Sequence, residues 1–111
     1  MKRRTKELAL RVIRMYARLP KTAVARVLGK QVLRSGTSVG ANYREADEGR
    51  SKPEFIAKMG DSLRELSETE YWLELLVESE TVKSDTMTPL LKETRELKLI
   101  FASIIRKARS A

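Results

Sequence analysis

The sequence predicts an all-α protein: an up-and-down antiparallel four-helix bundle that forms a single domain over residues 1–111. Apolar residues recur at spacings of three and four through four long segments, which is the pattern of amphipathic helices. The breaks between these segments fall at Pro20, at residues 49–51 and at the polar stretch 81–86. A bundle of this size can bury a core alone, but small bundles often associate, so we expect a homo-oligomer.

The first helix is expected over residues 4–19, because Pro20 disfavours the helical conformation in the residue before it. Its apolar stripe consists of Leu8, Val12, Met15, Tyr16 and Leu19. The arginines Arg4, Arg11, Arg14 and Arg18 line a neighbouring face.

The second helix is expected to run without a break over residues 22–49. Its stripe of apolar and small residues comprises Val24, Val27, Leu28, Gln31, Val32, Ser35, Ser38, Val39, Asn42 and Ala46. Gly29, Gly36 and Gly40 each cost about 1 kcal/mol in a helix interior, but they share one face. We therefore expect a close helix contact there, within or between subunits. The alternative is a helix-turn-helix with a turn between Gly29 and Ser35, although the stripe passes through that turn without a change of phase.

The third helix, over residues 52–80, should start at a capping box in which Ser51 caps and Glu54 reaches back. Its seam consists of Phe55, Met59, Ser62, Leu66, Thr69, Leu73 and Leu76.

The fourth helix, over residues 86–107, carries Pro89 in its first turn, where proline is tolerated. Its stripe consists of Met87, Leu90, Leu91, Thr94, Leu97, Phe101, Ile104, Ile105 and Ala108. Leu99 and Ile100 fall off this stripe, so we expect an oligomer to bury them.

The net charge of +8 is divided unevenly along the chain. Residues 1–44 contribute +11, residues 45–80 contribute −7 and residues 81–111 contribute +4. A basic half beside an acidic helix fits two functions. It can be a footprint for nucleic acid, or it can pair with the acidic helix of a neighbouring subunit.

The candidate phosphate contacts are the cations that line the first two helices. They are Arg4, Arg11, Arg14, Arg18, Arg26, Lys30 and Arg34. The plainer interpretation is a solvated face, but such a face usually mixes the two signs of charge. Because aromatic residues are few, base stacking is not an obvious contributor, and we expect binding to be mainly to the backbone and dependent on salt.

The absence of histidine and cysteine removes the usual general base, the commonest metal ligands and disulfides. We therefore expect no enzyme, no cofactor and no metal. The weaker alternative is a magnesium site formed by Glu45, Glu65 and Glu68. Instead, we expect a polar network or interface formed by Ser35, Ser38, Asn42, Glu45, Glu65, Glu68 and Trp72.

No apolar run is long enough to span a membrane, and no signal region is recognisable, so a cytoplasmic location is expected.

Three motifs carry a resemblance to a known family. They read Gln31-x-x-Arg34-Ser35-Gly36-Thr37-Ser38-x-Gly40-Ala41-Asn42-x-x-Glu45-Ala46, then Ser51-Lys52-x-x-Phe55-x-x-Lys58, then Glu65-x-x-Glu68-Thr69-x-Tyr71-Trp72-Leu73. In this combination and order, the chain closely resembles the four helix bundle proteins encoded in intervening sequences of bacterial 23S ribosomal RNA genes.

The resemblance implies a left-handed bundle that assembles as a homopentamer and has a basic surface suspected of binding RNA or DNA. No catalytic activity is attached to the family. The chain is also similar to the accessory variability determinant proteins of diversity-generating retroelements, which implies a reverse transcriptase as a further partner. The competing hypothesis is a structural assembly protein whose basic face pairs with the acidic helix of the neighbouring subunit.

Overall fold

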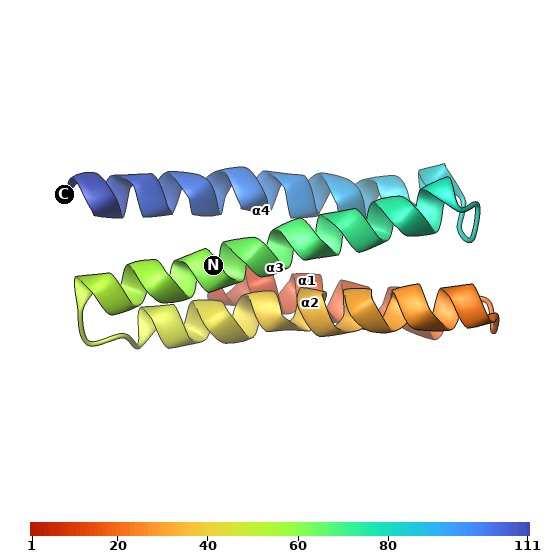
Figure 1. Cartoon of the computed structure of the whole chain (residues 1–111), viewed down its shortest axis with the longest axis horizontal. Coiled ribbons are helices and arrows are strands. Elements are labelled where there is room, and N and C mark those ends of the chain that lie inside the picture. Colours follow the sequence, from red (N-terminus) through yellow and green to blue (C-terminus); the bar gives the residue numbers. More distant parts are fainter.

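Four helices account for most of the chain in the computed structural model, which describes residues 1–111. They are α1 (Lys2–Ala17), α2 (Ala23–Asp47), α3 (Lys52–Glu78) and α4 (Ser84–Ser110). The chain reverses at each loop, so consecutive helices run antiparallel and lie side by side (Figure 1). The prediction of an all-α fold with four helices is confirmed. No helix combines the length and the hydropathy that crossing a membrane requires.

The helix ends follow local capping chemistry. The hydroxyl of Thr22 accepts a hydrogen bond from the Ala25 N–H at the start of α2, and the Ser51 hydroxyl does the same for the Glu54 N–H at the start of α3. The predicted capping box is wrong in one detail, because the Glu54 carboxylate accepts from the N–H of Arg50, one residue before the cap.

Most helix ends differ from the prediction by one to three residues, and two of these differences have a clear local cause. The first helix ends at Ala17, before Leu19, because a residue that precedes proline disfavours the helical conformation. The last helix continues to Ser110, past Lys107, since neither proline nor glycine interrupts it there.

The three glycines of α2 lie against α1 within the same chain. A Cβ atom added at Gly36 would lie 2.8 Å from Val12 Cγ2, and one added at Gly40 would lie 3.2 Å from Thr5 Oγ1. Gly29 faces Tyr16 in the same way. The predicted close helix contact is therefore confirmed and is intramolecular. The helix-turn-helix alternative is wrong, because α2 is continuous through the supposed turn.

The predicted stripe of α2 is wrong at its first turn. Val24 and Val27 are 52% and 62% exposed, whereas Ala25 and Gly29 are buried. The buried face is turned toward α1 at this end, because the small residues let the two helices approach closely. The sequence pattern predicted that Val24 and Val27 are buried because they are larger and more apolar than Ala25 and Gly29.

The contact between α2 and α3 contains buried polar residues as well as leucine and valine. The Thr69 hydroxyl donates to Ser35 Oγ at 2.8 Å, and the Ser62 hydroxyl donates to the Val39 carbonyl at 2.7 Å. All three hydroxyl-bearing residues are fully buried. The Ser62 hydroxyl has no other partner, so a slip of either helix would leave it unpaired, and the Thr69–Ser35 bond would be lost as well; the two contacts therefore favour one register of the pair.

A pair of alanine substitutions tests the glycine contact. Gly36→Ala should destabilise the protein by about 1–3 kcal/mol, because the stiff Val12 side chain must move to admit the methyl group. The matched control is Gly60→Ala in α3, where nothing lies within 4 Å of the added Cβ. There, the gain in helix propensity should stabilise the protein by up to about 1 kcal/mol. Urea unfolding measures both, and equal effects of the two substitutions would contradict the close contact.

Candidate nucleic-acid interface

The seven predicted phosphate contacts divide into two groups in the structure. Two of them, Arg4 and Arg34, form ion pairs with acidic residues of other helices. The remaining five form no ion pair within the chain. These five are Arg11, Arg14, Arg18, Arg26 and Lys30, and we call them the free basic surface.

Arg4 joins α1 to α4. Its guanidinium donates two hydrogen bonds of 2.8 Å to the Glu93 carboxylate and one of 2.9 Å to Glu96. These hydrogen bonds hold the pKa of the Glu93 carboxyl below its ordinary value. They likewise raise the pKa of Arg4. A guanidinium engaged with two carboxylates has little capacity left for a phosphate, so Arg4 stabilises the fold.

Arg34 has the corresponding role between α2 and α3. It donates to Glu65 at 3.2 Å and also pairs with Glu68. The carboxylates of Glu65 and Glu68 thus bind an arginine. Glu45 pairs with Lys58 at 3.0 Å.

The other members of the predicted network make local contacts. The Ser38 hydroxyl donates to the Arg34 carbonyl within its own helix, and Asn42 makes no side-chain hydrogen bond. Trp72 is half-buried beside Tyr71, and its indole N–H is buried without a partner. The carboxylates proposed for a magnesium site are held by cations instead, and no group of three or more ligand-type side chains forms a metal site.

The acidic residues of α3 are largely matched within the chain. Arg95 of α4 donates to Glu70 at 2.7 Å and to Glu74 at 2.8 Å, and Lys98 also donates to Glu70. Burial alone would raise the pKa of Glu70, but the hydrogen bonds from Lys98 and Arg95 outweigh it and lower the pKa. Little of the negative charge on this helix is left to neutralise a neighbouring subunit.

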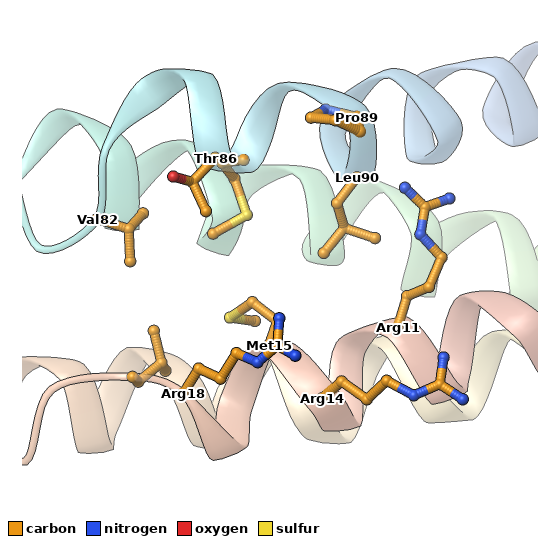
Figure 2. A pocket seen from close by; sticks show the side chains of 10 residues that line it. Arg11, Arg14, Met15, Arg18, Val82, Thr86, Pro89 and Leu90 are labelled. Carbon is orange, nitrogen blue, oxygen red and sulfur yellow. The ribbon is translucent and has the colours of Figure 1, made fainter.

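Part of the free basic surface borders a groove between α1 and α4, which contact each other least of the neighbouring helices. The groove has a volume of about 310 Å³. Arg11 and Arg14 project from α1 and Arg18 from the residue that caps its C-terminus, and the Arg11 side chain extends toward α4 (Figure 2). Arg26 lies outside this groove, beside a second hollow that Tyr16 helps to line, where α1 turns into α2.

Sequence reasoning missed this groove. It treated the arginines of the first helix as one row on an open surface and did not place them against the fourth helix. Two signals were available. Arg4, Arg11 and Arg18 are spaced by seven residues, which is about two helical turns and places them on one side of the helix. The break at residues 81–86 also places the start of the last helix near the end of the first.

Comparison with known proteins identifies the relatives of this chain. The model of the 23S rRNA-intervening sequence protein family matches residues 1–103. The chain belongs to this family. The resemblance inferred from the sequence motifs is thereby confirmed for the 23S rRNA-intervening sequence proteins.

A solved structure supports the same assignment. It is a protein of unknown function from the S23 ribosomal protein family of Bacteroides thetaiotaomicron VPI-5482. The two chains share 39% sequence identity with a TM-score of 0.88, over 95% of this chain and 94% of the other. A search among curated proteins found no match. Membership in the 23S rRNA-intervening sequence protein family thus supplies the fold but no activity.

The ion pair between α1 and α4 predicts a pH dependence. Because folding lowers the pKa of Glu93, its contribution to stability is present above the unfolded pKa of about 4.3 and is lost as the pH falls through the folded value. Glu93→Gln should therefore cost about 1 kcal/mol at pH 7, and this cost should shrink below pH ~4.

Urea unfolding between pH 3 and pH 7 measures this difference. Glu96→Gln is the matched control, since Glu96 is more exposed and accepts only one of the three hydrogen bonds from Arg4. A cost of Glu93→Gln that is the same at every pH would contradict the assignment.

Proposed function

We propose that the protein is a non-enzymatic homo-oligomer that binds nucleic acid through the free basic surface of α1 and α2. The observation that carries this proposal is the uneven use of charge within the chain. Most of the acids of α3 and α4 are paired with Arg4, Arg34, Arg95 and Lys98, while the five cations of the free basic surface form no ion pair within the chain. Unpaired cations gathered on two adjacent helices suit phosphate contact.

The same observation weakens the competing hypothesis of assembly by charge. A basic face that binds the acidic helix of the next subunit needs carboxylates that are free to receive it. Five carboxylates of that helix, those of Asp61, Glu65, Glu68, Glu70 and Glu74, already pair with cations of the same chain. We therefore place nucleic acid, and not the neighbouring subunit, opposite the basic face.

The homo-oligomer is proposed to form through apolar residues outside the core. Leu99 on α4 is 75% exposed, and Val24 and Val27 on α2 are also exposed. An isolated chain would leave these large side chains in water, whereas a contact between subunits would bury them. The resemblance suggests a pentamer, with a reverse transcriptase as a further partner. An apolar contact of this kind should keep its subunits together in high salt.

A charge-reversal variant tests the proposed nucleic-acid surface. Replacing Arg14, Arg18 and Lys30 together by glutamate should weaken binding to a structured RNA by about tenfold or more. It should also flatten the salt dependence. The slope of log affinity against log salt concentration should become less negative by roughly 0.7–0.9 for each phosphate that the variant no longer binds. Fluorescence anisotropy between low and moderate salt measures both quantities.

The matched control reverses Lys83, Lys92 and Lys107, which are exposed, unpaired and outside the proposed surface. It changes the net charge by the same amount, so it should reduce affinity much less. Equal losses in the two variants would mean that only net charge matters. An unchanged affinity in the first variant would overturn the proposal.

A further inference from the structure

The groove between α1 and α4 has the dimensions of a small-ligand site. Its volume of about 310 Å³ lies at the lower end of the roughly 300–1,000 Å³ typical of pockets for small molecules. It runs along the last two turns of α1, from Arg11, and continues past the end of the helix to Arg18 and Leu19. Val82 and Leu90 project toward it from the opposite side, the first from the loop before α4 and the second from α4 itself (Figure 2).

The walls of the groove combine two kinds of chemistry. Met15 and Met87 contribute to an apolar floor, and methionine adapts its shape to flat or irregular ligands. The rim formed by α1 and its C-cap residue carries three cations, all of them arginine. Arginine pairs with phosphate through two parallel hydrogen bonds and also stacks on flat rings, which lysine does not do. An apolar floor beside such a rim complements a molecule that is flat and apolar at one end and anionic at the other.

We propose that this groove receives an unstacked base of a single-stranded RNA, while Arg11, Arg14 and Arg18 contact the adjoining phosphates. This inference rests on the proposed function and adds a substrate class to it. The bases of a duplex are paired and stacked, so they cannot enter a pocket at the protein surface. The site therefore selects single strands, loops and bulges over perfect duplex.

An acidic helix is the other occupant that the charges would suit, but the size of the groove disfavours it. A helix with its side chains is about 10–12 Å wide, and a helix that docks in a groove makes contacts over several turns. The groove offers only two turns of α1. A single nucleotide fits this length, and its phosphates can reach the arginines along the rim.

Three RNA probes of equal length test the selection, with the full-length protein and fluorescence anisotropy at one salt concentration. The first is a single strand of about 12 nucleotides. The second is the same strand with abasic sugars in its central half, which keeps every phosphate and removes bases. The third is a blunt duplex. We expect the intact single strand to bind about tenfold more tightly than the abasic strand, because removing the base removes its burial against the apolar floor and its stacking on an arginine of the rim.

Two alanine variants connect this difference to the groove. Met15→Ala truncates the floor and should reduce the preference for the intact strand about threefold or more, while the affinity for the abasic strand stays the same. Leu10→Ala is the matched control on α1, because Leu10 is partly exposed and lies outside the groove. Circular dichroism establishes that both variants fold. Arg18→Gln should weaken binding of both strands alike.

The results separate the two proposals. Equal affinity for the intact and abasic strands, or a preference for duplex, overturns the base-binding groove while leaving the basic surface intact. The same holds if Met15→Ala retains the full preference, or if an acidic peptide displaces the RNA and its own binding is abolished by Met15→Ala. Failure of every RNA probe, and of DNA of the same sequence and length, to bind at low salt overturns the proposed function itself.

Discussion

The close approach of α1 to α2 determines how the rest of the molecule is arranged. Because Gly36 and Gly40 carry no side chain, α1 lies against the backbone of α2 and cannot rotate about its own axis without a clash. With Val12 directed at Gly36, the residues spaced by seven from Arg4 must face α4. The contact of α1 with the glycines of α2 thus fixes the direction in which the arginines on the other side of α1 point.

That orientation gives equivalent arginines different roles along the same helix. Arg4 meets Glu93 and Glu96 and becomes a link between α1 and α4. Seven residues further on, Arg11 forms no ion pair, although its charge adds to the effect of Arg4 in lowering the pKa of Glu93. Arg18, which caps the C-terminus of α1, lies beside apolar residues near the start of α4 and forms no ion pair. The bundle is held together at one end by charge and is left open at the other, and the open end carries the cations that are available to a ligand.

Much of the fold could be predicted from the sequence, because helix periodicity, prolines and caps act locally. The glycine face could also be predicted, since its position depends only on helix geometry. The partners of the cations could not. Whether Arg34 binds Glu68 or a phosphate depends on which helix lies beside it, and one chain read alone does not give that distance. The valines of the first turn of α2 were misplaced for the same reason, because burial there depends on how closely α1 approaches.

The central claim is that the basic face remains free for nucleic acid after the protein has assembled. The most direct test is light scattering coupled to size exclusion, at low and high salt, with and without a structured RNA. The account predicts a multimer of the 12.7 kDa chain that keeps its mass in high salt and gains RNA only in low salt. A multimer that ignores RNA at low salt, or that dissociates in high salt, would contradict it and assign the basic face to assembly.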